Sequence, residues 1–528
     1  MTDATSDAPA AEGELESFSA RFARFAAEFG DRTAVVLRPE RDTEGESLTF
    51  AELDRRGNAM ARHLASLGAG EGSFVTVAEP NSLEFLVACL GCWRIGAIPQ
   101  PVSSRLPRLE LDAIIELADA AAVVGVAGDA DHGRPVVPRG FRPGPDVDDS
   151  PLPDIVSSAW KAPTSGGSTG RPKLIVSGDP SSVARMVEST FPAIGARRGA
   201  IMTIPGPLYH NGPFIWTWQT LLSGGEVVLL PRFDAVDTLA AIDEHRATSC
   251  YLVPTMMQRM WKLPDDVKAR YDLSSLEIAV HLAEPCPPWL KEVWIDWIGP
   301  DVLWELYGGT EGQASTLLSG AEWLEHRGSV GRPLAGEITI LDDDGNPVEP
   351  GTVGDVWMRP VGRDRPTYRY VGADAETHAD GWECLGDIGW MDADGYLYLA
   401  DRRKDMILVG GANVFPAEVE AAIAAHEGVA SCCVIGLPDE DKGHRVHAII
   451  QPDAAVGSAE GAIDVDELRS FLAERLVTYK LPRTFEFVDE PLRDDAGKVR
   501  RAQLTDERIA ALETAAPETA APTEETPA

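Results

Sequence analysis

The sequence predicts an α/β protein with a large N-terminal domain, built from doubly wound α/β subdomains and a β-rich subdomain, and a small mobile α+β C-terminal domain. Three observations lead to this prediction: a length of 528 residues, alternating strand and helix patterns, and a change to short strands after about residue 336. A chain of this length exceeds one hydrophobic core and should divide into domains. Strands that alternate with helices are typical of parallel sheets covered by helices.

The alternation of strands and helices begins near residue 48. Thr49 and Glu52 are spaced as a capping box, and the apolar face of the helix that follows ends before Gly68. Further helix patterns cover residues 83–95, 236–245 and 287–298, and short apolar runs that predict strands cover residues 74–77, 226–230 and 250–253.

The pattern becomes β-rich in the section that closes the large domain. Short strands are predicted at 338–341, 355–358 and 388–391, and the dipeptides Asp344-Gly345 and Asp394-Gly395 predict tight turns between strands.

The C-terminal part of the chain predicts a second, smaller domain. A helix is expected at 416–426, a strand at 432–435 and another helix at 465–476. The expected boundaries are a disordered leader (1–13), an N-terminal domain (14–401), a hinge (402–404), a C-terminal domain (405–512) and a disordered acidic tail (513–528).

The charge of the chain restricts its partners. A formal net charge of −37 disfavours nucleic acid and anionic membrane surfaces, because both would repel the protein. The seven cysteines are irregularly spaced without metal-type doublets, and no apolar run is long enough to span a bilayer. We therefore expect reduced thiols, a cytoplasmic location and no membrane partner. An acidic protein that binds a polyphosphate needs local cations, so its few placed Lys and Arg residues are informative.

A glycine- and hydroxyl-rich segment at 164–173 carries the strongest chemical signal. Glycines let backbone N–H groups approach an anion, hydroxyls add donors and a terminal Lys supplies a point charge, which together suit a polyphosphate. The segment is not a Walker A loop, since Leu174 follows the lysine and an apolar strand pattern follows in place of a helix. A flexible surface linker is the weaker alternative. The candidate phosphate-binding residues are Ser165, Gly166, Gly167, Ser168, Thr169, Gly170 and Lys173.

At this loop the sequence resembles the adenylate-forming superfamily of acyl- and aryl-CoA synthetases, nonribosomal adenylation domains and luciferases. The resemblance covers nearly the whole chain, because further motifs follow in the family's order. The amino-acid sequences of the loop and of residues 207–213 and 285–291 are most similar to those of bile-acid and fatty-acid CoA ligases. Gly166 replaces a hydroxyl residue that is common in the family, which removes one phosphate contact.

Two further motifs supply candidate nucleotide-binding side chains. Residues 307–311 offer a hydroxyl and a carboxylate on a glycine turn, which can bind phosphate and Mg²⁺. A carboxylate at residue 387 can accept hydrogen bonds from both ribose hydroxyls. The resemblance implies that Thr310 contacts the α-phosphate, Glu311 holds Mg²⁺, Tyr307 stacks on adenine, Asp387 binds the ribose with Arg402 beside it, and Lys404 is the hinge residue.

Lys498, which follows Gly497 near the C-terminus, is the candidate catalytic lysine. A Lys on a glycine-hinged loop can neutralise charge that builds up between a carboxylate and the α-phosphate. On the residues alone an exposed basic strand end is the better interpretation, and the catalytic role comes from the resemblance. Gly410, Gly411 and Asn413 suit close approach to an extended ligand or a bare turn. Similar residues in acyl-CoA synthetases line the pantetheine tunnel.

His210 and Glu284 complete the candidate site. The resemblance places His210 beside the substrate carboxylate as a positioning or gating residue, and Glu284 on the adenine side. No base is required, because a thiol is partly ionised near neutral pH and an acyl-adenylate is strongly electrophilic. Trp216, Trp218 and Gln313 are weaker candidates for the border of the acyl pocket.

Together these motifs predict an ATP-dependent acid–CoA ligase that forms an acyl-AMP, releases pyrophosphate and then makes the CoA thioester. The expected ligands are a small-molecule carboxylic acid, ATP, Mg²⁺ and CoA, and the protein is expected to be a monomer or homodimer. Other acceptors stay open: a carrier-protein thiol, an amine, or an oxyanion such as nitrite in diazotases. A nucleotide-sensing protein without catalysis is disfavoured, because a pure binder does not need Lys498.

Overall fold

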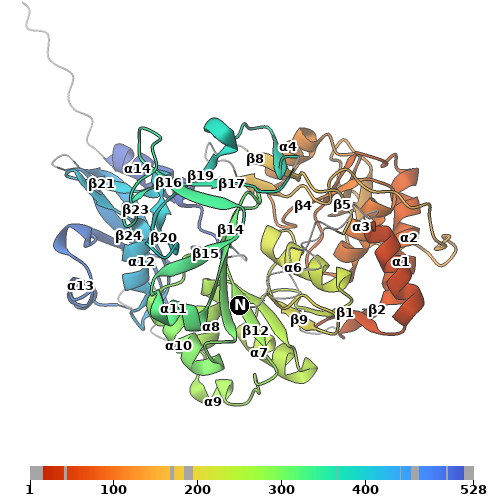
Figure 1. Ribbon diagram of the computed structural model, residues 1–528, viewed down its shortest axis with the longest axis horizontal. Coiled ribbons are helices and arrows are strands. Elements are labelled where there is room, and N and C mark those ends of the chain that lie inside the picture. The colour runs from red at the N-terminus through yellow and green to blue at the C-terminus, as the bar shows by residue number, and fades with distance from the viewer. Residues whose placement is uncertain are drawn as a thin grey trace, which may run out of the picture.

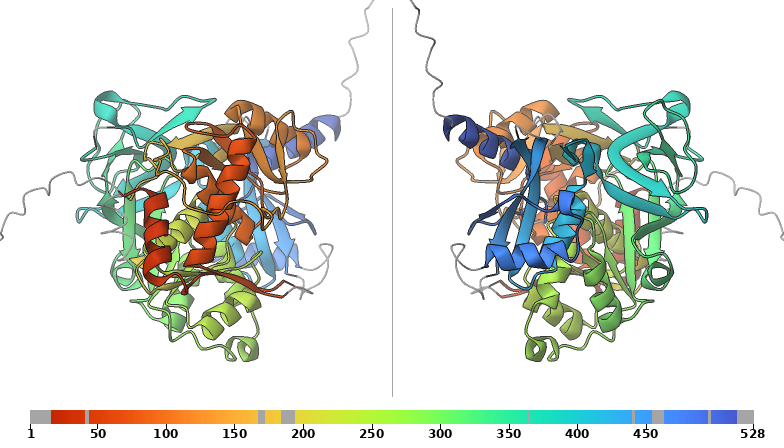
Figure 2. Two further views of the ribbon diagram at one scale, coloured as in Figure 1. Left: turned by 90° about the vertical axis from the view of Figure 1, so that its right-hand side faces the viewer. Right: turned by 90° about the vertical axis from the view of Figure 1, so that its left-hand side faces the viewer.

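The order of the chain can be followed across the molecule in the computed structural model. The N-terminal helices, in red, lie at one end, and the C-terminal elements, in blue, lie at the other (Figures 1 and 2). The green strands of the middle of the chain lie between them. The structure describes residues 16–40, 44–166, 172–183, 194–363, 365–439, 442–453, 463–494 and 497–515.

The first subdomain is a small parallel sheet with helices packed against it. Its elements are α1 (Phe18–Phe29), α2 (Phe50–Ser66), β3 (Phe74–Val77), α3 (Leu83–Arg94), β4 (Ile98–Pro101), α4 (Arg108–Ala118), β5 (Ala122–Val126) and β6 (Val136–Pro138), with strand order β4-β3-β5-β6. The capping box that starts α2 is confirmed. Helices α2 and α3 touch closely, because a Cβ at Gly57 would lie 2.7 Å from Leu90 Cδ2.

A second parallel section forms half of a 13-stranded sheet. Its strands are β1 (Thr33–Leu37), β2 (Glu46–Thr49), β9 (Ile201–Ile204), β10 (Glu226–Leu229), β11 (Ser249–Leu252), β12 (Ile278–His281) and β13 (Leu303–Gly308), and its helices are α6 (Asn211–Leu222), α7 (Ala235–His245), α8 (Pro254–Trp261), α9 (Asp265–Lys268) and α10 (Pro288–Ile298). Except for β2, these strands run parallel in the order β13-β12-β11-β9-β10-β1.

The same sheet continues as an antiparallel section, which is the predicted β-rich subdomain. Its elements are β14 (Ser315–Ser319), α11 (Gly320–Glu325), β15 (Ser329–Ala335), β16 (Glu337–Leu341), β17 (Gly354–Arg359), η2 (Ala379–Gly381), β19 (Glu383–Met391) and β20 (Leu397–Arg402). A separate three-stranded sheet contains β7 (Thr164–Gly166), β8 (Pro172–Ser177) and β18 (Tyr368–Val371) in the order β18-β8-β7. Both predicted Asp-Gly turns are confirmed, with φ of +79° at Gly345 and +83° at Gly395.

The C-terminal domain has its own five-stranded sheet and its own hydrophobic core. Its elements are η3 (Arg403–Asp405), β21 (Ile407–Val409), β22 (Ala412–Val414), α12 (Pro416–Ala424), β23 (Val429–Asp439), β24 (Gly443–Pro452), α13 (Val465–Ala473), η4 (Thr478–Lys480), β25 (Thr484–Phe487) and α14 (Arg501–Ala515). Fully buried apolar residues such as Val414, Val434 and Leu468 fill this core.

The predicted fold class is confirmed. The differences lie at element ends and in elements that were not predicted, among them α1, α6 and α14. Strand β23 is longer than the predicted 432–435, and Arg402, the first residue of the predicted hinge, is the last residue of β20. Helix α14 was not predicted, and it continues into the first residues of the predicted tail. The leader and the rest of the tail lie outside the described residues, and the exact domain boundaries stay predictions. Within the described part of the chain, no helix has both the length and the apolar character needed to cross a membrane.

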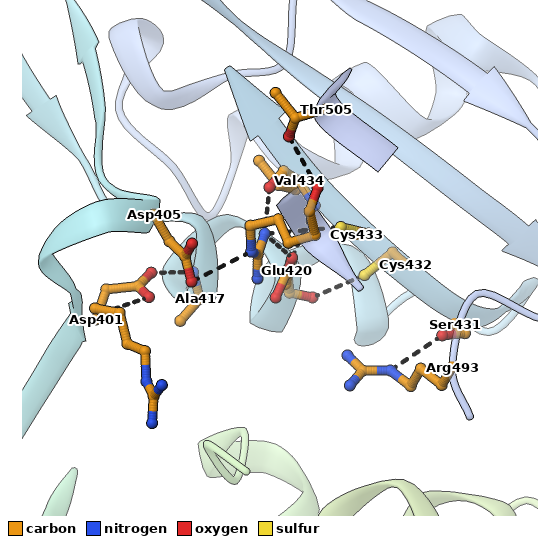
Figure 3. Close-up of polar contacts among 12 residues, drawn as sticks. Asp401, Asp405, Ala417, Glu420, Ser431, Cys432, Cys433, Val434, Arg493 and Thr505 are labelled. Atoms are coloured by element: carbon orange, nitrogen blue, oxygen red, sulfur yellow. Dashed lines mark hydrogen bonds and ion pairs between the residues drawn. The ribbon is translucent and has the colours of Figure 1, made fainter. Parts of the chain in front are cut away.

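Arg501, the first residue of α14, ties this helix to the rest of the C-terminal domain. Its Nη1 donates to Glu420 Oε1 at 2.7 Å and to the carbonyl of Val434, and its Nε lies 3.7 Å from Asp405 Oδ2. Figure 3 shows Asp405, Glu420 and Val434 gathered around this contact. The Arg501 and Glu420 side chains are only 18% and 13% exposed, so the pair is largely desolvated.

We expect Arg501→Met to destabilise the C-terminal domain, because Glu420 would be left buried without its cation. Breaking a buried pair in this way costs about 3 kcal/mol. Urea unfolding of the full-length protein, followed through the C-terminal transition, measures the effect. Arg469→Met removes an exposed pair with Asp466 and serves as the control, with a change within about 0.5 kcal/mol. Equal stability of the two variants would contradict the role of Arg501.

Candidate functional site

Asp387 lies on β19 of the β-rich section, and its partners come from β20 and from β13 of the parallel section. Its Cα is paired with that of Arg402 in the ladder between β19 and β20. The Tyr307 hydroxyl, from the end of β13, donates to Asp387 Oδ2 at 2.7 Å, and Arg402 Nε lies 3.2 Å from Asp387 Oδ1. Burial and the Asp387 charge raise the pKa of Tyr307. Three residues predicted for the nucleotide are therefore in direct contact.

Glu311 is held beside them by a tyrosine that the sequence did not single out. The Tyr370 hydroxyl donates to Glu311 Oε1 at 2.6 Å, and Glu311 is buried. Lys173 Nζ lies 3.7 Å from the centre of the Tyr370 ring, a cation–π contact. Desolvation lowers the pKa of Lys173, with Arg402 acting in the same direction and Glu311 opposing both.

The described phosphate-loop candidates lie on the two strands of the β7–β8 hairpin. Ser165 pairs with Lys173, and Gly166 pairs with Pro172, in the ladder between β7 and β8. Strand β8 follows the loop, as predicted, where a Walker A loop would be followed by a helix. The predicted residues Gly167, Ser168, Thr169 and Gly170 lie outside the described residues.

Thr310 sits on the glycine turn between Tyr307 and Glu311. The Gly312 N–H donates to the carbonyl of Gly309 at 3.2 Å, and φ of Gly312 is +72°. A Cβ at Gly309 would lie 2.4 Å from Leu385 Cδ1, so the turn is pressed against β19. The Thr310 side chain is half-buried there. The turn thus places Thr310 directly before Glu311 in a partly buried position, and its contact with phosphate stays a prediction.

Lys498 lies on a turn of the C-terminal domain whose Gly497 is pressed against Glu284 of the large domain. Its N–H donates to Asp494 Oδ1 at 2.9 Å, and its carbonyl accepts from the Asp494 N–H at 3.0 Å, which holds a tight turn. The side chain is exposed, but protein surrounds it closely enough that desolvation lowers its pKa. Arg402 lowers that pKa further, whereas Asp494, Glu284 and Glu311 raise it. The charges of Arg402, Glu284 and Glu311, all candidate nucleotide-binding residues, therefore act on the Lys498 ammonium.

His210 is the residue directly before α6, and it is half-buried. Burial, together with the Lys498 ammonium, lowers the pKa of His210 to about 3, so the imidazole is neutral at physiological pH. Its Nε2 is buried without a hydrogen-bond partner among the described residues. A neutral histidine with a free ring nitrogen suits the predicted positioning role and not that of an acid.

Lys161 is a buried cation of the site that the sequence analysis missed. Only 5% of it is exposed, and its ammonium donates to the side-chain oxygen of Asn211, the first residue of α6. Desolvation lowers the pKa of Lys161 to about 7, although Asp179 and Glu311 oppose this effect. A Lys within the small and apolar run 159–162, directly before the phosphate loop, is the sequence signal that could have revealed it.

Glu284 is buried between the two domains. The Thr255 N–H and hydroxyl donate to its Oε2 at 3.2 and 2.8 Å. Burial raises the pKa of Glu284, and Arg493 of the C-terminal domain opposes this increase. The predicted position of Glu284 beside the nucleotide candidates is consistent with its effect on the pKa of Lys498.

The weaker acyl-pocket candidates separate into two groups. Trp218 is a core residue, whose ring lies 4.5 Å from that of Trp93 and 6.0 Å from that of Phe22. Trp216 is also buried. Gln313 instead joins a polar group beside Glu311, because its Nε2 donates to Glu383 Oε2 at 2.7 Å. The ring contacts of Trp218 favour a core position, and its place at the border of an acyl pocket stays a prediction.

Gly410 and Gly411 form the turn of the β21–β22 hairpin, with φ of +56° and +86°. The Gly410 N–H donates to the Lys442 carbonyl at 2.9 Å, a contact within the C-terminal domain. Asn413 on β22 is exposed. The structure does not bring these residues into contact with Asp387 or Glu311. Lys404, in η3, is exposed, and its positive charge lowers the pKa of Lys173.

The sequence pattern of the AMP-binding enzyme family matches residues 22–362, and that of the AMP-binding enzyme C-terminal domain matches residues 418–498. This protein belongs to the AMP-binding enzyme family. The predicted resemblance to adenylate-forming CoA ligases is thus confirmed, while the narrower resemblance to bile-acid ligases stays a prediction.

Curated relatives extend over most of this AMP-binding enzyme. It is 32% identical over 474 residues to a feruloyl-CoA synthase from Amycolatopsis sp, covering 87% of this chain and 94% of the relative. It is 31% identical over 496 residues to the fatty acid–[acyl-carrier-protein] ligase ScoC from Streptomyces coeruleorubidus, covering 88% and 92%. The structure of o-succinylbenzoate CoA synthetase from Bacillus subtilis has a similar fold, with a TM-score of 0.77 at 24% identity over 92% of this chain and 98% of that one.

We expect Lys161→Met to change how stability depends on pH. The pKa of Lys161 is about 7 in the folded protein, below the ~10.4 of an unfolded lysine. Between these values the unfolded chain holds the proton and the folded protein releases it, so wild-type stability rises with pH. The stability of the Met variant relative to wild type should therefore fall by about 2 kcal/mol between pH 7 and pH 9.

Urea unfolding of both proteins at the two pH values measures this difference. Lys442→Met, at an exposed position, is the matched control. A stability difference between Lys161→Met and wild type that does not vary with pH would contradict the buried, deprotonating lysine.

Proposed function

We propose that this protein is an ATP-dependent acid–CoA ligase, which activates a carboxylic acid as its acyl-AMP and then forms the CoA thioester. The observation that carries the proposal is that the turn with Lys498, from the C-terminal domain, is docked on Glu284 of the large domain. A Cβ at Gly497 would lie 2.1 Å from Glu284 Oε1, and Arg493 Nη1 lies 3.5 Å from the same oxygen. Membership of the AMP-binding enzyme family supports it, and so do relatives named for CoA ligation.

The nucleotide contacts follow from the geometry of the buried acidic groups. Asp387 would accept the ribose hydroxyls, and Tyr307 would lie against the adenine while its hydroxyl keeps the Asp387 carboxylate in place. Glu284 would face the adenine side. The phosphates would lie between the β7–β8 loop and Thr310, with Lys173 as the point charge at the base of the loop.

Glu311 fits the Mg²⁺ that accompanies ATP. The described residues hold no group of three or more metal-ligating side chains, which suits a cation bound by one carboxylate, water and phosphate oxygens. The Tyr370 hydroxyl occupies Oε1 of Glu311, so Oε2 would be the ligand atom. The ion would supply positive charge to the polyphosphate.

In the first half-reaction an oxygen of the substrate carboxylate attacks the α-phosphorus, and the bond from that phosphorus to the pyrophosphate oxygen breaks. Lys498 stabilises the negative charge that develops between carboxylate and α-phosphate. Neutral His210 and the Lys161–Asn211 contact would fix the N-terminal end of α6 beside the acid. The acyl-AMP and pyrophosphate are the products.

In the second half-reaction the sulfur of CoA attacks the acyl carbon, and AMP leaves with the electron pair of the broken C–O bond. The proton of the thiol passes to water. We propose that the C-terminal domain turns about Lys404 between the two steps, which withdraws Lys498 and presents Gly410, Gly411 and Asn413 to the pantetheine arm. The exposed hairpin turn of these residues is consistent with a contact that forms only after that rotation.

A different acceptor is the second candidate. The 31% identical ScoC is named for transfer to an acyl-carrier protein, and the adenylation machinery would be the same for that acceptor, an amine or nitrite. A cytoplasmic location and a monomeric or homodimeric state stay predictions, and the seven free cysteines are consistent with the former.

Carboxylate-dependent pyrophosphate release, measured with aliphatic, aromatic and steroid acids in the presence and absence of CoA, tests the proposal. We expect sustained turnover with at least one acid class only when CoA is present. Turnover that needs another acceptor would favour the second candidate, and no carboxylate-dependent release with any acid would contradict the proposed activity.

We expect Lys498→Ala to reduce acyl-AMP formation by at least about 100-fold, because the charge that stabilises the transition state is lost. Conversion of a preformed acyl-AMP to the thioester should stay within about threefold of wild type, because Lys498 is withdrawn in that step. Lys480→Ala, which removes a pair with Glu418 elsewhere in the C-terminal domain, is the control. Equal loss of both half-reactions in a folded Lys498→Ala protein would contradict this division.

A further inference from the structure

The turn that carries Lys498 is braced by Arg493, an arginine that the proposed reaction steps do not use. Arg493 opens this turn, and its residue is paired with Val499 across it. Arg493 Nη1 donates to the carbonyl of Gly497 at 2.7 Å, directly before the lysine. Its Nε donates to Ser431 Oγ of β23 at 3.2 Å, a contact drawn in Figure 3. One guanidinium therefore joins the turn to the sheet of its own domain.

The same guanidinium also crosses to the large domain. Arg493 Nη1 lies 3.5 Å from Glu284 Oε1, and the two side chains are 20% and 9% exposed. Thr255 satisfies the other oxygen of Glu284, and Oε1 has no hydrogen bond from any described residue. Arg493 is thus the cation that faces the open side of a buried carboxylate.

The Lys498 turn is packed closely against the Glu284 side chain. A Cβ at Gly497 would lie 2.1 Å from Glu284 Oε1, and φ of Gly497 is +82°, a conformation that favours glycine. The residue before Lys498 is therefore seated directly against Glu284. A small displacement of Glu284 or Arg493 moves the peptide from which the catalytic side chain extends.

We propose that Arg493 is a positioning residue that locks the Lys498 turn onto Glu284 during acyl-AMP formation and releases it for thioester formation. The proposal rests on the proposed function and deepens it. The Ser431 and Gly497 contacts lie within the C-terminal domain and move with it, whereas the Glu284 contact exists only when this face of the domain is docked. The lock therefore acts in one of the two arrangements of the domain.

Two other contacts between the domains do not involve the turn in the same way. Lys262 Nζ donates to the carbonyl of Val429 at 2.5 Å, and Arg500 Nη1 lies 3.7 Å from Glu110 Oε2 on α4. The Arg500 and Glu110 side chains are 62% and 37% exposed, so their pair is screened by solvent. Arg500 is thus a matched arginine, two residues beyond Lys498, that bridges the domains without holding the turn.

The test compares the two half-reactions in Arg493→Met, with the acid that gives turnover in the wild type. We expect acyl-AMP formation, measured as single-turnover pyrophosphate release without CoA, to slow by about 10- to 100-fold, the effect of losing a charged hydrogen bond. Thioester formation from preformed acyl-AMP should stay within about threefold of wild type. Arg493→Lys should recover part of the loss, because an ammonium can face Glu284 but cannot also reach Ser431 and Gly497.

Arg500→Met is the control and should leave both half-reactions within about threefold of wild type. Glu284→Gln should also slow acyl-AMP formation. Its effect should be non-additive with that of Arg493→Met, because both variants break the same contact between Arg493 and Glu284. Equal losses in both half-reactions of a folded Arg493→Met protein, unchanged acyl-AMP formation, or full additivity with Glu284→Gln would each overturn the proposal. Absence of carboxylate-dependent pyrophosphate release in the wild type would instead overturn the proposed function.

Discussion

The site depends on holding carboxylates in fixed positions inside a protein that is already strongly acidic. Asp387 and Glu311 each receive a hydrogen bond from a tyrosine hydroxyl, at 2.7 and 2.6 Å, which orients them without neutralising them. A chain with a net charge of −37 repels a polyphosphate at long range, so attraction must be local. Lys173, Arg402 and Lys498 supply that local positive charge around the two carboxylates.

The cations come from different parts of the fold, so the site is complete only when the C-terminal domain is docked on the large domain. Lys173 belongs to the small β18-β8-β7 sheet, Arg402 ends β20, and Lys498 belongs to the C-terminal domain. Arg501 binds α14 to Glu420 and approaches Asp405, next to Lys404. The lysine turn and the hinge region are thus parts of one polar framework, so a rotation at the hinge carries Lys498 with it.

Local signals allowed much of the fold to be predicted, and long-range contacts account for the rest. The capping box at Thr49 and the Asp-Gly turns depend on residues a few positions apart, so the sequence contains all that determines them. Helix α14 was missed because its polar sequence is stabilised by Arg501 and by apolar contacts with β23. For the site, motifs singled out Asp387 and Lys498, but the partners Tyr370, Lys161 and Arg493 acquire their importance only through burial and pairing across 50 to 209 positions.

A crystal structure with Mg²⁺ and an ATP analogue that carries a methylene group between the α- and β-phosphorus would test whether both domains contact a single bound nucleotide. The ribose is expected on Asp387, the Mg²⁺ on Glu311, the phosphates beside Lys173 and the Lys498 ammonium at the α-phosphate. A nucleotide bound elsewhere, or one bound here with the Lys498 turn facing away from the α-phosphate, would contradict the convergence of the two domains on a single nucleotide.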